Sequence, residues 1–336
     1  MNHIPVLLNE VLEIVGAYCI RPDLLGVLHT PLQNKTIIDC TFGAGGYSRA
    51  FLERGANVIA FDRDPSVAVI AAQLASEFPG RFQFINEPFS KLGEILELIS
   101  KSIGANNYLP LQCAKFDAIV FDLGVSSMQI DTPERGFSFR FDALLDMRMG
   151  DVGAYCIRPT SQGVLHTPLQ NQTAAELIEN SSVSELARIL RDYGDVKKAM
   201  PIARAAKDAL PQTTFALRDL IHNPKDIAPV FQALRIAVND EMGEIERALA
   251  AVPDLLAKGG ICAVVTFHSL EDRLVKNTFR EWTETKGDPR LPVPLADDSG
   301  AISPRFKLLK TVTPSDAEIS ANPRARSAHL RAVIKL

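Results

Sequence analysis

The sequence TIIDCTFGAGGYSRAFLERG, residues 36–55, combines a short apolar run, a group of glycines and a segment with helical spacing. It predicts a buried strand that ends at Asp39, then a tight turn, then a helix. The glycines Gly43, Gly45 and Gly46 let the backbone approach a ligand closely, and the first helical turn offers free N–H groups. The stretch therefore predicts an α/β sheet with a nucleoside-type ligand at this edge.

The same alternation continues around this stretch. Apolar runs of the strand type lie at residues 57–65, 81–90 and 116–124. Segments with helical spacing separate them at residues 66–78 and 91–103. A short amphipathic helix is expected at residues 3–15, with Pro5 in its first turn. Strands that alternate with helices predict a parallel, doubly wound sheet.

The pattern changes after about residue 132. Residues 181–210 and 213–223 have helical spacing, and Ser182 with Glu185 forms the pattern of a capping box. Residues 230–256 predict one long amphipathic helix. A buried strand at residues 261–267 follows, and the runs 306–312 and 327–336 are expected to complete the sheet as an antiparallel pair.

The sheet domain is therefore expected to be discontinuous. Its first part is residues 1–132 and its second part is residues 229–336. An inserted helical domain, residues 133–228, is expected between the fourth and fifth strands.

A 19-residue segment occurs twice, at residues 16–34 and 153–171, and the copies differ at three positions. The flanking sequences share nothing, and two copies are too few for a repeat architecture. Both copies are therefore expected to be exposed, irregular insertions. A Cys2His2 metal site built from the two copies is disfavoured because nine residues separate each cysteine from its histidine. The four residues concerned are Cys19, His29, Cys156 and His166. No metal is expected.

The composition is that of an ordinary globular protein. Of 336 residues, 46% are hydrophobic and 23% charged, and the net charge is −4. The sequence shows neither a signal peptide nor a membrane-spanning run, and its five cysteines lack the spacing of a disulfide framework. A cytoplasmic location without membrane association is expected, with nucleic-acid contact limited to local basic patches.

A carboxylate follows the second strand. Asp62 lies 17 residues after Gly45, where it can accept hydrogen bonds from ribose hydroxyls. Ser48 stands where the dinucleotide fingerprint requires its third glycine. The sequence therefore favours S-adenosylmethionine, which has no pyrophosphate, over a nicotinamide cofactor.

Asp122 ends the fourth strand and precedes LGVSS. Enzymes that methylate amino groups carry two prolines and an aromatic residue at this position, and these are missing here. Two interpretations stay open. Asp122 holds an amine or the amino end of the cofactor, or it caps the end of the strand.

Ten segments together resemble the RsmH family, also called MraW, of ribosomal RNA cytosine-N4 methyltransferases. In chain order they are HIPVLLNEV, DCTFGAGGYSRAFLE, FDRDP, EPFS, DLGVSSMQID, ERGFSF, LDMRM, FQALRIAVNDE, FHSLEDRLVK and NPRARSAHLR. The resemblance covers nearly the whole chain outside the two repeated segments. It implies a class I S-adenosylmethionine-dependent methyltransferase sheet with an inserted helical domain for substrate recognition. It also implies N4-methylation of one decoding-centre cytosine in 16S rRNA of the small ribosomal subunit.

The resemblance also implies site residues. The cofactor contacts carried over are Gly45, Gly46, Tyr47, Asp62, Phe89, Asp122 and Gln129. Tyr47 departs from the usual histidine and Met128 from the usual proline. Cytosine N4 is a poor nucleophile, so a hydrogen bond that redirects its lone pair is expected to matter. We assign that catalytic role to Asp122 with Ser126 and Ser127.

Candidate RNA contacts lie late in the chain. From Ser303 onward the sequence contains seven Lys or Arg residues and two acidic residues, which gives this segment a net charge of +5. The candidates are Arg324, Arg326, Arg331 and His268. For His268, capping of a turn is the alternative to RNA contact. Phe137, Phe139 and Phe141 are expected either to stack on RNA or to pack between domains.

Other functions remain open at this stage. The alternatives are a non-catalytic RNA-binding ribosome-assembly factor on the same fold, a DNA amino-methyltransferase and a nicotinamide oxidoreductase. The missing prolines count against the DNA enzyme, and the missing third glycine counts against the oxidoreductase. The oligomeric state is open as well, with a homodimer allowed.

Overall fold

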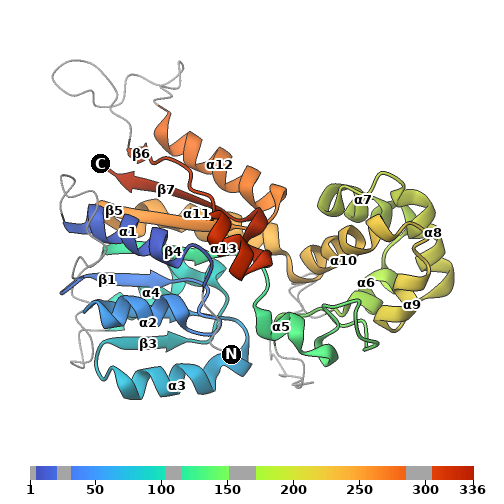
Figure 1. The fold of residues 1–336 in the computed structure, drawn as a ribbon, viewed down its shortest axis with the longest axis horizontal. Helices are drawn as coiled ribbons and strands as arrows, with labels where there is room; N and C mark the ends of the chain where they lie inside the picture. Colours follow the sequence, from blue (N-terminus) through green and yellow to red (C-terminus); the bar gives the residue numbers. More distant parts are fainter. Residues whose placement is uncertain (1–4, 21–31, 103–114, 151–171, 285–304) are drawn as a thin grey trace. The chain divides into compact units, whose positions relative to one another are not determined.

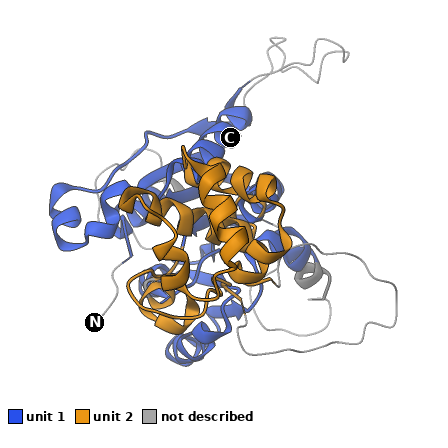
Figure 2. Ribbon diagram, turned by 90° about the vertical axis from the view of Figure 1, so that its right-hand side faces the viewer, with its two compact units in different colours: residues 1–124, 244–336 blue, residues 125–243 orange. Residues whose placement is uncertain are grey.

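The computed structural model describes residues 5–20, 32–102, 115–150, 172–284 and 305–336. It comprises two compact units, residues 1–124 with 244–336 and residues 125–243 (Figure 2). Within the described ranges, no helix has the length and apolar character needed to cross a membrane.

The first unit is built on a seven-stranded sheet in the order β3-β2-β1-β4-β5-β7-β6 (Figure 1). The strands are β1 (Thr36–Asp39), β2 (Asn57–Phe61), β3 (Phe82–Ile85), β4 (Phe116–Asp122), β5 (Leu256–Thr266), β6 (Phe306–Leu308) and β7 (His329–Lys335). The first five run parallel, whereas β7 is antiparallel to both β5 and β6. The doubly wound sheet with a final antiparallel pair is thus confirmed.

Helices pack against this sheet. They include α1 (Leu8–Ile20), α2 (Gly46–Glu53), α3 (Ala68–Glu77) and α12 (Ser269–Thr283). The same unit also contains α4 (Leu92–Ser102) and α13 (Asp316–Ala321). α1 contacts β4 and β5, and α12 contacts β5, β6 and β7. Large side chains fill the space between the layers, and the fully buried aromatic ones are Phe51, Phe61, Phe121, Phe279 and Phe306. Each such side chain contributes roughly 1.5–3 kcal/mol by leaving water.

The second unit is helical. Its helices are α5 (Ser127–Asp131), α6 (Ala174–Asn180), α7 (Val183–Gly194), α8 (Ala199–Ala209), α9 (Thr214–Asp219) and α10 (Pro224–Asn239). They enclose their own apolar core, to which α7 contributes Leu186 and Leu190 and α10 contributes Phe231 and Leu234. The expected capping box is confirmed: the Ser182 hydroxyl accepts from Glu185 N, and the Glu185 carboxylate accepts from Ser182 N. The inserted helical unit is confirmed as well.

The boundaries of the units differ from those expected. The second unit begins at residue 125 rather than 133 and ends at residue 243 rather than 228. The C-terminal boundary lies later than expected because α10 packs on α6 and α7. This helix contributes Val230, Phe231 and Leu234 to the helical core. Its sequence pattern continues without a visible change into the next helix, so periodicity could not assign it.

The expected single helix over residues 230–256 is two helices. α10 ends at Asn239 and α11 (Glu241–Leu255) begins two residues later. Asp240 between them has a φ of 48°, in the left-handed region. A helix cannot continue through that conformation, and Asp is one of the few residues that tolerate it.

The N-terminal helix also differs from expectation. α1 begins at Leu8, so Pro5 lies outside it, and Leu7 has a φ of 55°. The helix runs to Ile20 and therefore includes the first five residues of the first repeated segment. Ala17 within it is buried, so this part is not an exposed, irregular insertion. Residues 21–31 and 153–171, with the remaining expectations for the two copies, lie outside the described residues.

Candidate active site

Acidic residues gather at the carboxyl edge of the sheet in the first unit. Asp39 pairs in register with Ala60 of β2 and Val120 of β4, so the ends of these three strands lie together. Asp39 ends β1, Asp62 directly follows β2, and Asp122 ends β4. This edge is where a doubly wound sheet places its ligand.

Asp62 holds the glycine turn. Its Oδ2 accepts a hydrogen bond from Gly43 N at 2.8 Å, and its Oδ1 accepts one from Asp64 N at 2.9 Å. Gly43 and Gly45 have φ values of 52° and 76°, which a residue with a side chain rarely adopts. Burial is the main cause that raises the pKa of Asp62. Each carboxylate oxygen keeps a second lone pair, so the group can still accept from a ligand hydroxyl.

The Asp39 carboxylate joins the end of β1 to α2 through hydrogen bonds. It is fully buried, and its Oδ1 accepts from Thr41 N at 3.2 Å while its Oδ2 accepts from the Ser48 hydroxyl at 2.7 Å. Burial raises the pKa of Asp39 to about 6, against the opposing effect of the Ser48 hydrogen bond. Both of its oxygens are thus used within the protein.

Asp122 differs from both. Its backbone N donates to Thr41 Oγ1 at 2.7 Å, which fixes the end of β4 to the loop after β1. Within the described part of the chain, its Oδ1 is buried and has no hydrogen-bond partner. Burial raises the pKa of Asp122 well above its ordinary value, and the nearby carboxylates of Asp39 and Glu271 raise it further. A buried carboxylate oxygen without a partner is costly, so this group has unmet capacity to bind a donor.

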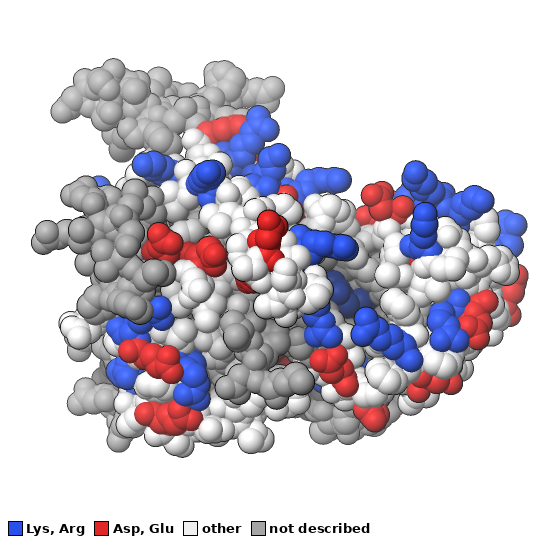
Figure 3. Space-filling model, viewed as in Figure 1, with Lys and Arg blue, Asp and Glu red and all other residues white. Residues whose placement is uncertain are grey.

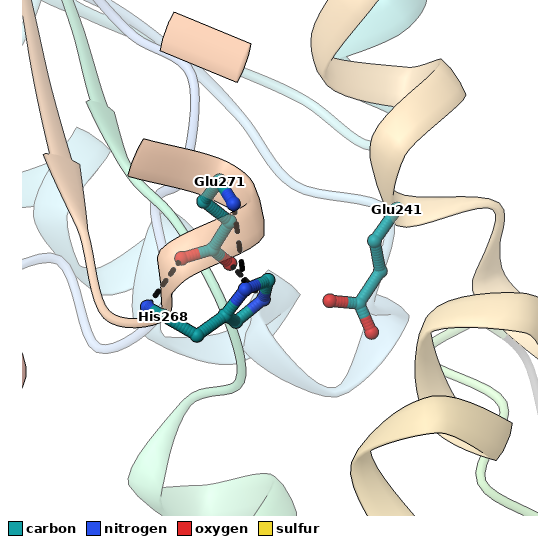
Figure 4. Close-up of side chains that lie close together, drawn as sticks. All are labelled: Glu241, His268 and Glu271. Atoms are coloured by element: carbon teal, nitrogen blue, oxygen red, sulfur yellow. Dashed lines mark hydrogen bonds and ion pairs between the residues drawn. The ribbon is translucent and has the colours of Figure 1, made fainter. Parts of the chain in front are cut away.

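His268 and Glu271 face each other at the start of α12, directly after β5 (Figure 4). Glu271 Oε2 accepts from Phe267 N at 2.8 Å and from His268 N at 3.2 Å. His268 Nδ1 accepts from Glu271 N at 3.4 Å, and its Nε2 lies 2.9 Å from Glu271 Oε1. Both ring nitrogens therefore face Glu271, a geometry that fits helix capping. Glu241, also drawn in Figure 4, binds the Arg235 guanidinium within the second unit at 2.7 and 2.9 Å.

The two aromatic candidates have different surroundings. Phe89 begins a short 3-10 helix (Phe89–Lys91), is half-buried and packs edge-on against Phe121 with ring centroids 5.7 Å apart. Tyr47 is 3% exposed, and its hydroxyl donates to the carbonyl of Val6. No sequence pattern predicts this contact, which joins α2 to the N-terminal segment. Direct contact of Phe89 or Tyr47 with a cofactor stays a prediction.

Ser126 and Gln129 form a capping box at the start of α5, in the second unit. The Ser126 hydroxyl accepts from Gln129 N at 3.2 Å, and Gln129 Oε1 accepts from Ser126 N at 3.0 Å. Gln129 is buried. The side chain of Ser127 lies outside the described part of the chain. The expected roles of these three residues stay predictions.

The arginine candidates for RNA contact differ in their exposure and in their partners. Arg331 on β7 makes a two-bond ion pair with Asp272, at 2.7 and 2.9 Å, and is largely buried. This pair ties β7 to α12 and accounts for the guanidinium structurally. Arg324 and Arg326 are exposed on the short helix Pro323–Ser327. Figure 3 shows further Lys and Arg side chains over the part of the view where Figure 1 places α12, whose exposed cations are Arg273, Lys276 and Arg280.

The three phenylalanines of RGFSFRF lie in the second unit. Phe139 packs edge-on against Phe231 with centroids 5.4 Å apart, and Phe137 contacts the same core. Phe141 is 49% exposed. Phe137 and Phe139 thus pack within the core of the second unit, which is neither of the two expected roles.

Sequence reasoning missed three residues of this edge: Thr41, Ser48 and Glu271. Thr41 accepts a hydrogen bond from Asp122 N, and Ser48 donates one to the Asp39 carboxylate. Glu271, in the first turn of α12, is 1% exposed. A hydroxyl residue close after a strand that ends in an acid is a weak signal for Thr41 and Ser48. The burial of Glu271 has no signal in the sequence.

Comparison with known proteins identifies the family. The MraW methylase family model matches residues 1–336. A "Ribosomal RNA small subunit methyltransferase H" from Chelativorans sp. (strain BNC1) is 42% identical over 344 residues, covering 98% of this chain and 86% of the relative. Proteins with the same name from Rhodospirillum rubrum and Rickettsia bellii are 40% and 39% identical, covering 98% and 99% of this chain and 93% and 99% of each relative. The resemblance drawn from the ten sequence segments is thereby confirmed, and the chain belongs to the MraW methylase family.

Proposed function

We propose that this chain transfers a methyl group from S-adenosylmethionine to the exocyclic N4 of one decoding-centre cytosine in 16S rRNA of the small ribosomal subunit. Three of its relatives at 39–42% identity carry the name of a small-subunit rRNA methyltransferase, which supports the class of substrate. The observation that carries the proposal is the buried Oδ1 of Asp122, which has no hydrogen-bond partner among the described residues. It lies at the edge that also holds the glycine turn and Asp62.

The residues of this edge fit the cofactor. The glycine turn and Asp62 suit a nucleoside, because the carboxylate can accept from ribose hydroxyls while it holds Gly43 N. The half-buried ring of Phe89 suits stacking near adenine. Asp122 suits the amino end of the cofactor or the amine to be methylated. When bound, S-adenosylmethionine supplies an electrophilic methyl group on a sulfonium sulfur.

Asp122 has two tasks in this proposal. The lone pair of cytosine N4 is delocalised into the ring, and a hydrogen bond from the amine to Asp122 would orient the group and favour attack. The amine must also lose a proton as the new bond forms. In its ionised form Asp122 can accept that proton, and the burial that raises its pKa favours the protonated product. The roles expected for Ser126, Ser127 and Gln129 stay part of this proposal.

Substrate RNA is proposed to be held through its phosphates. Arg324 and Arg326 are exposed and provide positive charge on the first unit. A cytosine in folded RNA must leave its stack to reach a pocket, which costs a few kcal/mol unless the base is already unstacked. Action on ribosomal subunits in the cytoplasm is part of the proposal.

Replacement of one carboxylate tests the proposal. Asp122→Asn keeps the shape of the side chain but removes its charge and its proton affinity. Methyl transfer to small subunits that lack the modification should slow by about 100-fold or more, the usual effect of losing a general base. The exposed Glu281→Gln on α12 is the matched control and should stay within about twofold of the parent. A parental rate for Asp122→Asn would contradict the role of Asp122.

A further inference from the structure

Residues 5–7, here called the N-terminal strap, lie immediately before α1. Leu7 is fully buried and adopts a φ of 55°, a left-handed conformation that costs free energy for a residue with a branched side chain. Such a conformation persists only where the surroundings enforce it, and it is often found next to ligand sites. The contacts that enforce it are therefore informative.

Two side chains hold the strap through its backbone. Glu318 Oε1 on α13 accepts a hydrogen bond from Leu7 N at 2.7 Å, across 311 positions of the sequence. The hydroxyl of Tyr47 on α2 donates to the carbonyl of Val6. Leu7 O in turn accepts from Val11 N at 2.9 Å and so starts α1. The strap is thus fixed from both sides by residues far from it in sequence.

The strap also packs on the glycine turn itself. A Cβ built on Gly46 would lie 2.3 Å from Pro5 Cγ and 2.7 Å from Pro5 Cδ, so Pro5 occupies the space that any side chain at residue 46 would need. Gly46 and Tyr47 are the first two residues of α2, whose N-terminus follows the turn anchored by Asp62. The strap therefore touches the first turn of the helix proposed to face the cofactor.

The Tyr47 hydroxyl lies close to the acidic edge. Burial raises the pKa of Tyr47 well above its ordinary value, and Asp122 and Asp39 are the next contributors. The hydroxyl is therefore protonated at neutral pH and donates to Val6 O. Its position links the strap to the region around Asp122.

We propose that Tyr47 and Glu318 are positioning residues, which lock the N-terminal strap against the first turn of α2 and so keep the glycine turn in its cofactor-binding shape. This inference rests on the proposed function, because it assigns the strap to the cofactor site of the methyltransferase. It gives Tyr47 an indirect role through the strap, and it brings Glu318 into the site although no sequence motif indicates it.

The test compares three variants by the affinity for S-adenosylhomocysteine, measured by calorimetry. Tyr47→Phe and Glu318→Ala each remove one hydrogen bond to the strap, and both should weaken binding by about 5-fold. Glu318→Gln keeps an oxygen that can accept from Leu7 N, so it should retain the parental affinity.

Amide hydrogen exchange at Leu7 reports on the strap directly. Exchange should be faster in Tyr47→Phe and in Glu318→Ala than in the parent, and close to the parental rate in Glu318→Gln. Tyr193→Phe, in the core of the second unit, is the matched loss of a hydroxyl and should change neither exchange at Leu7 nor affinity.

The outcomes separate the two claims. Failure of the unmodified chain to bind S-adenosylhomocysteine would contradict the proposed function. Normal binding by the parent, with unchanged affinity in both Tyr47→Phe and Glu318→Ala, would overturn the role of the strap alone. Faster exchange at Leu7 without any loss of affinity would also overturn it, since the lock would then be structural only.

Discussion

Three aspartates at one sheet edge illustrate how the surroundings decide the task of a side chain. Asp39 has both oxygens bound within the protein and serves to join β1 to α2. Asp62 shapes the glycine turn and keeps spare lone pairs. Asp122 has a buried oxygen without a partner among the described residues. The sequence predicted Asp62 and Asp122 as site residues, but their different surroundings became visible only in the structure.

Asp39 makes stability depend on pH. Its pKa is about 6 in the folded protein and 3.8 as the ordinary value, so between these values the folded state binds more protons than the unfolded state. Stability linked to Asp39 is therefore complete below about pH 4 and is lost as the pH rises through about 6. The loss amounts to roughly 3 kcal/mol, since one pKa unit corresponds to about 1.4 kcal/mol.

Asp39→Asn removes this titration and should flatten the fall in unfolding free energy between pH 4 and pH 6.5. Urea denaturation at several pH values measures the unfolding free energy of each variant. Glu281→Gln is the control for the loss of an exposed carboxylate. The same decline in the Asp39→Asn variant as in the parent would contradict the assignment.

At the scale of elements, periodicity predicted where helices and strands lie but not where helices break. The breaks that it missed occur at residues with left-handed backbone that are not glycine, namely Asp195 and Asp240. α7 and α8, which flank Asp195, pack against each other, and a single sequence does not show such packing. The Ser182 capping box was predictable because its signal is entirely local.

Leu210 ends α8 with a φ of 44° and is 39% exposed. Glycine adopts this conformation without the steric cost that a side chain brings, so Leu210→Gly should raise the unfolding free energy by about 0.5–1 kcal/mol. Ala209→Gly is the control with the opposite sign, because Ala209 is helical and glycine there should cost about 0.5–1 kcal/mol. Thermal unfolding should show that Leu210→Gly is more stable than the parent and Ala209→Gly less stable. Destabilisation by Leu210→Gly would contradict this explanation of the helix end.

At the scale of the whole molecule, long-range contacts limited what the sequence could predict. The doubly wound sheet and the inserted helical unit follow from the order of local patterns, and family resemblance pointed to the site. The contact between Leu7 N and Glu318 spans 311 positions, and the ion pair of Asp272 with Arg331 spans 59. Neither leaves a pattern in one sequence. The helix that includes residues 16–20 was missed because the repeat itself suggested an insertion.

The two copies of the repeated segment should respond differently to deletion. Removing residues 16–34 deletes the end of α1, with the buried Ala17, and also the buried Leu32 that lies after this helix. The deletion should lower the unfolding free energy by more than about 3 kcal/mol. Residues 153–171 lie outside the described residues, and the sequence predicts them to be an insertion, so their removal should leave the unfolding midpoint nearly unchanged. Thermal unfolding of both deletions measures the difference. Equal destabilisation would show that the second copy is integral to its unit.

The most direct test of the central claim is to identify the methylated nucleoside. Small ribosomal subunits that lack the modification would be incubated with the chain and labelled S-adenosylmethionine, and the 16S rRNA would be digested and analysed by mass spectrometry. The account predicts label on the exocyclic N4 of a single decoding-centre cytosine, and its loss with Asp122→Asn. Label on another base, on another atom of cytosine or on many sites would contradict it.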